Sequence, residues 1–596
     1  MLSLLIAGLL GALTSGTAVP GAQASVSLPP FTVGYEPSSV DERGIWMEAD
    51  ERERRLRDST LTDRDEALNR YLRDVLCRTV GQERCTGVRI YVVEMPAFNA
   101  NMAPNGTMVI WSGLLLRVRS EAELAAVLAH EFAHFELRHS LHGYKQKRRA
   151  SDFAAWIAVL GGLTNTNTSA LQQSLLGSVF QFSREEEEAA DRLGFQYLAA
   201  ANYPTIAASQ LWQNIMAESD ATAIGHGQKP KQHYNAGFFD THPTSLRRAD
   251  YLAEESKKVG DTGRDARVEN LRAAMASHLP EWLDAQIKLN DFGGTEYLLQ
   301  QLAAQGGWTG ELLFSRGELY RLRGNPRDIV ASVQFYREAL AAGYAQPMLR
   351  RNLGMSLLRS GQKNDAQAEL HEYLRLMPDA TDAKAIQALL IQQDNHMNRI
   401  FAVVAALSVA ICTPAFGGNS LVQPGIQKAI ARSSLSAKAD GEWNRLARRD
   451  GKFVELWTRD GDSLNKVSFF GGVPIGEPLL READKKNRPL PKVGSNMLIT
   501  DIPALLESSY RIQFGANRFS VNEQEPATFG GYPGVKFSYT FINDADEVER
   551  KGEAIGAFIK DKLYLVTYEA PSIYFFDKDL SAFRSLVVSL QLEPKR

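Results

Sequence analysis

The segment HEFAH, from His130 to His134, constrains this chain more than any other part of its sequence. Histidines four residues apart lie one helical turn apart on the same face, so both imidazoles can bind one ion. A catalytic zinc accepts such a pair, and it also needs a third protein ligand and an open fourth position. Glu131 is placed to take a proton from an attacking water and return it to a leaving amine. The alternative is a surface helix that carries two histidines.

The helix that carries this segment has a recognisable start. Ser120 precedes a turn rich in glutamate, the pattern of an N-cap followed by acidic residues. Upstream, residues 66–76 have helical spacing, and two β-rich runs, residues 88–95 and 105–115, predict strands. The sequence therefore predicts an α+β domain, mainly helical and of the zincin type, around the metal site.

The third ligand must come from another segment, because the chain after His134 lacks the metzincin continuation HExxHxxGxxH. The best candidate is SREEEEAADRLG, which begins at Ser183. A run of acids usually marks a solvated face. However, Glu187 and Asp191 are one turn apart on a predicted helix. One of them could bind zinc while the other holds a ligand histidine by its second nitrogen.

Three segments together resemble the exported zinc metallopeptidases of the CAAX-prenyl-endopeptidase, HtpX and BepA-like family: HEFAH, SREEEEAAD and THPTSLRRADYL. The resemblance spans residues 40–255 and implies a single zinc ion. It implies that Glu187 is the third ligand and that Asp191 holds a ligand histidine. It also implies that His242, followed by Pro243 and Arg248, stabilises the tetrahedral intermediate or plugs the zinc in a resting state.

The same resemblance makes the strand after Asn105 an edge strand that can pair with an extended substrate.

Cys77 and Cys85 could form a disulfide in an oxidising compartment, and two reduced thiols are the alternative. The apolar run from Leu2 to Leu13 and the site at Ala22 to Ala24 predict a cleaved secretory signal, with a short membrane anchor as the alternative.

Downstream of the metal site, residues 282–390 have helical patterning and contain two similar segments. The second copy resembles a tetratricopeptide repeat, because Gly354, Ala366 and Pro378 fall at its close helix contacts and its helix end. Stacked helix pairs form a groove for a peptide or partner protein. An ordinary helical bundle is the alternative.

The last part of the chain alternates β-rich runs with two helical segments, which predicts an antiparallel sheet with helices on one side. It resembles PsbP-like or DcrB-like α/β sandwiches and is expected to have a binding or structural role. The apolar run from Ile400 to Ile411 looks like an internal signal segment. It is either a short anchor or buried helix between two exported domains, or the junction of two ancestral secreted proteins.

The chain is therefore expected to be multidomain. We expect a signal peptide (1–24), a zinc metallopeptidase domain (25–260), a helical repeat domain (261–396), a signal-like apolar segment (397–418) and an α+β domain (419–596).

We expect the protein to be a zinc-dependent endopeptidase of the bacterial envelope that is exported to the periplasm. Its association with a membrane is an open alternative, although the sequence has no clear spanning helix. Its expected substrates are unfolded or misassembled proteins, and the repeats could dock on outer-membrane assembly machinery. A net charge of −3 does not suggest a nucleic-acid partner. The alternative is a chaperone or adaptor of envelope protein assembly with little proteolysis and a fused binding domain.

Overall fold

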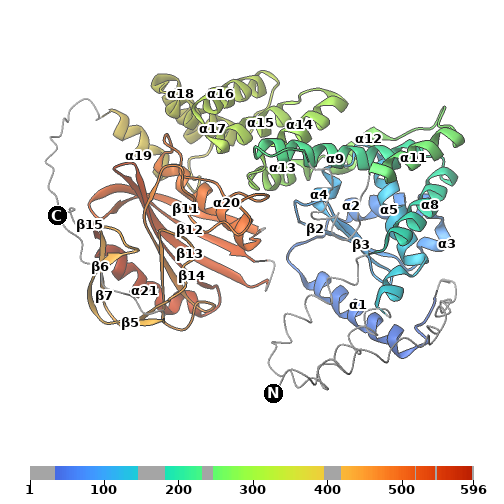
Figure 1. The fold of residues 1–596 in the computed structure, drawn as a ribbon. Helices are drawn as coiled ribbons and strands as arrows, with labels where there is room; N and C mark the ends of the chain where they lie inside the picture. The colour runs from blue at the N-terminus through green and yellow to red at the C-terminus, as the bar shows by residue number, and fades with distance from the viewer. Residues whose placement is uncertain are drawn as a thin grey trace, which may run out of the picture.

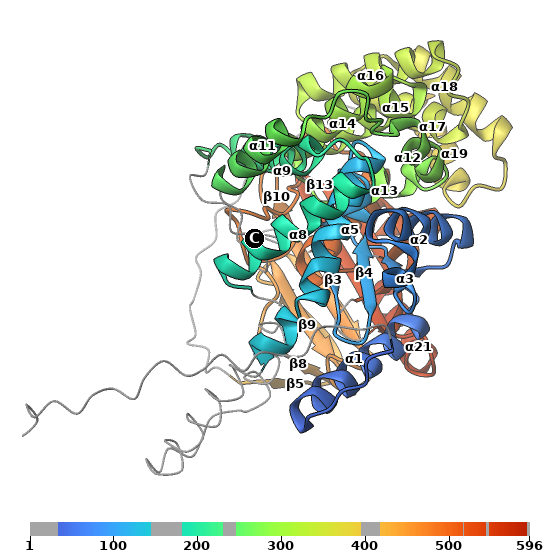
Figure 2. The ribbon, with the colours of Figure 1, turned by 90° about the vertical axis from the view of Figure 1, so that its right-hand side faces the viewer.

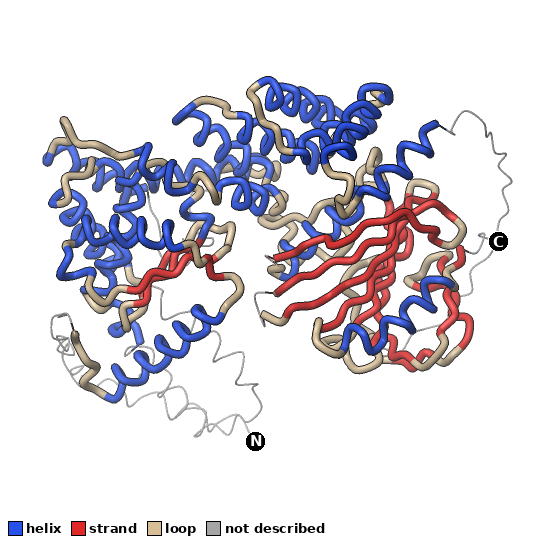
Figure 3. Tube along the Cα trace, turned by 180° about the vertical axis from the view of Figure 1, so that it is seen from behind, coloured by secondary structure: helices blue, strands red, loops and turns tan. Residues whose placement is uncertain are grey.

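The computed structural model describes residues 34–144, 182–230, 246–394, 418–516, 518–543 and 547–592. Its helices and strands form three groups in chain order, coloured blue to green, green to yellow and orange to red in Figure 1. Figure 3 shows one small sheet among the helices of the first group and a much larger sheet in the last group. The multidomain organisation, helical first and sheet-rich at the end, is as expected.

The first group packs helices around a four-stranded sheet of order β1-β2-β4-β3. β2 and β4 are parallel, whereas β1 and β3 run antiparallel to their neighbours. The strands are β1 (Thr62–Asp63), β2 (Arg89–Val93), β3 (Ala100–Met102) and β4 (Thr107–Trp111). The helices are α1 (Val40–Asp58), α2 (Glu66–Val80), α3 (Gln82–Cys85), α4 (Ser112–Leu115), α5 (Glu121–Glu136), α8 (Arg184–Ala200), α9 (Ile206–Gly225), α11 (Leu246–Val259) and α12 (Val268–Met275).

The expected position of the strand after Asn105 is wrong. That strand, β4, pairs with β2 on one side and with β3 on the other, so β1 and β3 form the edges of the sheet. β3 has only three residues, and such a short segment gives no alternation that a sequence pattern could detect. The edge that lies against α5 is therefore β3.

Helix α5 is the central helix of this group. It begins as predicted, because the Ser120 side chain accepts a hydrogen bond from the Glu123 backbone nitrogen at 3.1 Å. It packs against α2, α8, α9 and β3 (Figure 2). Gly194 of α8 faces α5, and a Cβ at that position would lie 3.2 Å from the backbone nitrogen of His130. The glycine therefore lets α8 approach the turn of α5 that carries the predicted ligands.

The second group consists of helices only, as the patterning of residues 282–390 predicts. They are α13 (Leu279–Ile287), α14 (Phe292–Gly306), α15 (Gly310–Arg323), α16 (Pro326–Ala341), α17 (Pro347–Arg359), α18 (Lys363–Leu376) and α19 (Ala383–Asp394). α15 packs against α16 and α17 against α18. Cβ atoms at Gly317 and Gly354 would lie 2.4 Å from Tyr336 and 2.6 Å from Leu370, so glycine permits the close approach within each pair. Their assignment as tetratricopeptide repeats stays a prediction.

The third group is built on an eight-stranded antiparallel sheet of order β11-β12-β13-β14-β10-β9-β8-β5, with a three-stranded sheet, β15-β7-β6, beside it. The strands are β5 (Ser420–Val422), β6 (Gly425–Ile430), β7 (Leu435–Ala439), β8 (Trp443–Arg445), β9 (Val454–Thr458), β10 (Lys466–Pro474), β11 (Arg518–Phe529), β12 (Tyr532–Ile542), β13 (Glu549–Ile559), β14 (Lys562–Pro571) and β15 (Gln591–Leu592). The helices are the 3-10 turn η2 (Ile499–Asp501), α20 (Ile502–Phe514) and α21 (Phe575–Val588).

The expectation of helices on one side of this sheet is wrong. On β14, Leu565 belongs to the hydrophobic cluster that contains α20, while its neighbour Val566 belongs to the cluster that contains α21. Successive residues of a strand point to opposite faces, so the two helices cover opposite faces. The segment LYLVTYEAP has apolar residues at consecutive positions, and that signal is typical of a strand buried on both faces.

Several predictions lie outside the described residues: the signal peptide (1–24), most of the apolar segment 397–418, and His242. Within the described ranges, none of the helices combines the length and apolar character that crossing a bilayer requires. Cys77 and Cys85 are joined as a disulfide between α2 and α3, the first of the two alternatives.

Candidate metal centre

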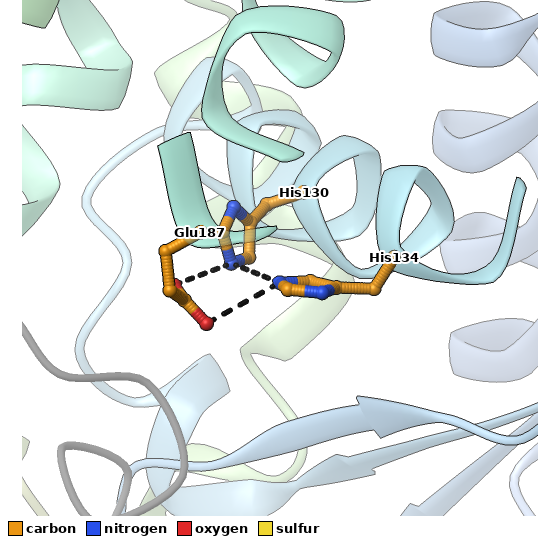
Figure 4. A group of neighbouring side chains, drawn as sticks. All are labelled: His130, His134 and Glu187. Atoms are coloured by element: carbon orange, nitrogen blue, oxygen red, sulfur yellow. Dashed lines mark hydrogen bonds and ion pairs between the residues drawn. The ribbon is translucent and has the colours of Figure 1, made fainter. Parts of the chain in front are cut away.

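The side chains of His130, His134 and Glu187 converge on one point between α5 and α8 (Figure 4). The two Nε2 atoms are 3.1 Å apart. The Glu187 carboxylate lies 3.5 Å from each of them, with Oε2 facing His130 and Oε1 facing His134. All three residues are at most 3% exposed. The HEFAH segment and Glu187 are more than fifty residues apart in the sequence, and the packing of α5 against α8 brings them together.

This donor set fits a zinc ion. Nitrogen ligands at about 2.0–2.1 Å from a tetrahedral zinc lie about 3.3 Å from each other. The observed nitrogen–nitrogen and nitrogen–oxygen separations are close to that value. Two imidazoles and one carboxylate also form one of the usual three-ligand sets of catalytic zinc, which keeps one position open. Among the described residues, this is the one group of three histidine, cysteine or acidic side chains close enough to share an ion.

The second ring nitrogen of each histidine has its own partner. His130 Nδ1 lies 3.0 Å from Asp191 Oδ1, and His134 Nδ1 lies 2.8 Å from His139 Nδ1. Burial lowers the pKa of His139 to about 4, so its imidazole is neutral near pH 7 and can accept a hydrogen bond from His134. Donation of a hydrogen bond from each Nδ1 would leave the lone pair of each Nε2 available to a metal ion.

Arg248 of α11 joins the two carboxylates of α8. Its guanidinium lies 2.5 Å from Glu187 Oε2 and donates two hydrogen bonds of 2.7 Å to Asp191. Tyr251, one turn further along α11, also donates to Asp191. Burial alone would raise the pKa of the Asp191 carboxyl, but Arg248 and His130 hold it below its ordinary value. Asp191 therefore stays ionised and can accept hydrogen bonds from Arg248, Tyr251 and His130.

Aromatic rings enclose the centre. Phe182 stacks on His134 with ring centroids 3.9 Å apart, and Trp212 of α9 meets His130 edge-on at 6.0 Å. The Arg248 guanidinium lies over the same tryptophan, 5.0 Å from its centroid. The charged groups of the site are buried, and electrostatic contacts are stronger in such surroundings than in water.

Three further polar residues lie on or just after α5: Glu131, His139 and His142. Glu131 follows His130 on α5 and is 1% exposed. His142, at the edge of the described range, is exposed and lies 3.2 Å from Glu186, away from the three converging side chains. His139 is not one of the three converging side chains. Its hydrogen bond to His134 was missed, because the chain turns back after α5 through Arg138, whose φ is 58°.

Sequence reasoning also missed Tyr251, Trp212 and Phe182. No spacing signal in the sequence connects these residues to the histidines, because each comes from a separate segment. Arg248 was noticed only as part of the resemblance, without its two carboxylate partners.

Comparison with known proteins agrees with this site. Residues 63–256 match the family model "Peptidase family M48". The chain is similar to the mitochondrial metalloendopeptidase OMA1 of Schizosaccharomyces pombe, with 30% identity over 188 residues (31% of this chain and 52% of that protein). It is similar to the beta-barrel assembly-enhancing protease of Yersinia pestis, with 25% identity over 370 residues (55% of this chain and 72% of that protein).

A third relative is the putative beta-barrel assembly-enhancing protease of Vibrio cholerae, with 29% identity over 206 residues (32% of this chain and 42% of that protein). The chain thus spans about half the length of two of these three relatives. The family match contains the helices that bring His130, His134 and Glu187 together. Residues 63–256 therefore match peptidase family M48, and the candidate metal centre lies inside the matched region.

Proposed function

We propose that the whole chain is a zinc-dependent endopeptidase of the bacterial envelope that hydrolyses peptide bonds in unfolded or misassembled envelope proteins. The observation that carries the proposal is the buried convergence of His130, His134 and Glu187, with partners on the second nitrogen of each histidine. Such support is typical of sites that hold a metal in one fixed geometry.

His130, His134 and Glu187 would hold the zinc, and Asp191 would orient His130. When bound, zinc supplies a Lewis acid that polarises a peptide carbonyl and acidifies water. Glu131 acts as general base and takes a proton from the attacking water. It then acts as general acid and delivers that proton to the leaving amine. His242 is proposed to stabilise the oxyanion or to plug the site in a resting state.

The helices after residue 260 are proposed to bind substrates or an outer-membrane assembly partner. Two observations support a role of this kind. The beta-barrel assembly-enhancing protease of Yersinia pestis aligns with 55% of this chain, which is more than the peptidase domain alone. The close helix pairs at Gly317 and Gly354 are also typical of stacked repeats. We also propose a periplasmic location, which the signal pattern of residues 1–24 supports.

The test is the variant Glu131→Gln, which keeps the shape of the side chain but cannot accept the proton. With zinc loaded, we expect cleavage of an unfolded test protein to fall by a factor on the order of 10²–10⁴, while the zinc content stays at one ion per chain. The matched control is Glu188→Gln, an exposed glutamate on α8. If Glu131→Gln cleaves like the wild type, Glu131 is not the base. If the zinc-loaded wild type does not cleave but prevents aggregation, the protein is a chaperone or adaptor.

A further inference from the structure

The sheet-rich group, residues 418–592, is held against the helices by charged contacts that cross between the two. Lys288, at the end of α13, lies 2.9 Å from Glu507 of α20. Burial works against both charges. Even so, the pKa of Lys288 is raised and that of Glu507 is lowered, since the two groups face each other and each has a second opposite charge nearby. The pair is therefore ionic, with side chains only 20% and 9% exposed.

A second acidic residue of the sheet-rich group meets two arginines of the helices. Asp501, at the start of α20, lies 3.9 Å from Arg321 of α15 and 3.8 Å from Arg359 of α17. Arg321 also pairs with Glu318 on its own helix. Arg359 is different, because its side chain is 3% exposed and Asp501 supplies the only carboxylate within 4 Å among the described residues. Burial lowers the pKa of Arg359, and Asp501 counters that effect. The charge of Arg359 is thus compensated from the other side of the interface.

Hydrogen bonds to carbonyl oxygens of the main chain and of side-chain amides fix the relative position of the two surfaces. The Asn290 amide donates to the Pro489 carbonyl oxygen at 2.9 Å, and the Arg359 guanidinium donates to Asn496 at 3.3 Å. At the other end, the Gln524 backbone nitrogen of β11 donates to the Thr381 carbonyl oxygen at 2.8 Å. Carbonyl and amide partners of this kind demand one relative orientation, which a non-specific contact between tethered domains does not need.

The peptidase domain provides a third point of contact. Arg518, at the start of β11, forms a two-pronged pair with Glu94, which follows β2, at distances of 2.9 and 3.0 Å. This pair is more exposed than the other two, with side chains 42% and 22% accessible. In Figure 1, α20 and β11 lie on the side of the large sheet that is nearer to the helices of the first two groups.

We propose that residues 418–592 act as a bound partner of the rest of the chain. In this view the surface of α13, α15 and α17 that carries Lys288, Arg321 and Arg359 is a recognition site for Glu507 of α20 and for Asp501, which precedes that helix. The sheet-rich group occupies this site specifically and stays bound when the covalent connection is cut. The proposal does not depend on peptidase activity. It applies equally if the connecting segment joins two domains or marks the junction of two ancestral proteins.

The test uses the full chain with a recognition sequence for a site-specific protease inserted between residues 400 and 415. After cleavage, the two parts are passed over a size-exclusion column at micromolar concentration. We expect them to elute together, and the affinity follows from titration of the separated parts. Separation of the wild-type parts at this concentration would overturn the proposal.

Two sets of variants test the recognition chemistry. Lys288→Met removes the cation and keeps the length of the side chain. We expect affinity to fall at least tenfold, because Glu507 is left with one partner fewer in a buried site. Lys258→Met, which removes a surface lysine from α11, is the control and should bind like the wild type.

The exposed pair permits a charge exchange. Arg518→Glu and Glu94→Arg should each weaken association, and the double variant should restore it. Loss of folding cannot produce such a rescue. Wild-type affinity in Lys288→Met, or a double variant weaker than both single variants, would overturn the assigned surface.

Discussion

The contact between Asp191 and His130 allows a quantitative prediction for the variant Asp191→Asn. The substitution keeps the shape of the side chain but removes the charge that His130 Nδ1 meets at 3.0 Å. Loss of such a partner typically lowers metal affinity 10- to 100-fold, which corresponds to about 1.4–2.7 kcal/mol. Arg248 also loses two charged hydrogen bonds of 2.7 Å but keeps Glu187 at 2.5 Å. Breaking a buried ion pair typically costs about 3–5 kcal/mol of folding stability. Because Arg248 keeps one of its two carboxylate partners, we expect the loss here not to exceed about 3 kcal/mol.

The assay is competition for zinc between the protein and a chromophoric chelator at pH 7.5, with a thermal melt of the metal-free protein in parallel. Asp250→Asn is the matched control, since Asp250 lies on the exposed side of α11. The control should match the wild type in both measurements. A zinc affinity of Asp191→Asn within twofold of the wild type would refute the reasoning that Asp191 supports the metal through His130.

Three further predictions concern other parts of the fold. Arg89 is the main cause that lowers the pKa of Glu53 to about 2, below its unfolded value of about 4.3. Glu53 therefore stabilises the fold above pH 4.3 and loses this effect as the pH falls towards 2, so denaturation titrations of Glu53→Gln should approach those of the wild type across that window. Replacing Cys77 and Cys85 by serine, which opens the loop between two positions with a sequence separation of 8, should cost about 2–3 kcal/mol in denaturant unfolding under oxidising conditions. Gly354→Ala should lower the melting temperature, because the new Cβ would lie 2.6 Å from a side-chain carbon of α18, and such overpacking costs about 1–3 kcal/mol.

Local features of the fold could be predicted from the sequence. The start of α5 at Ser120 depends on capping within a short segment and agrees with the structure. The β-rich runs at residues 88–95 and 105–115 contain β2 and β4, as predicted. The position of β4 inside its sheet could not be predicted, because it depends on pairing with a three-residue strand. The two covered faces of the large sheet were missed although the apolar run in β14 carried a signal for them.

The candidate site divides in the same way. His130, Glu131 and His134 were identified by helical spacing, whereas Glu187 needed the resemblance to a family, because a run of four acids gives no reason to choose one of them. The contacts of Arg248, His139 and Tyr251 result from packing between separate segments, and no spacing rule describes such packing.

The most direct test of the metal centre is the zinc content of Glu187→Gln compared with that of Glu185→Gln after dialysis against the same zinc buffer. Both variants remove one negative charge from the first turns of α8, but Glu187 is buried at the centre and Glu185 is exposed. We predict one zinc per chain in Glu185→Gln, as in the wild type, and a clear loss of zinc in Glu187→Gln. Unchanged zinc in a correctly folded Glu187→Gln would contradict the assignment of this centre.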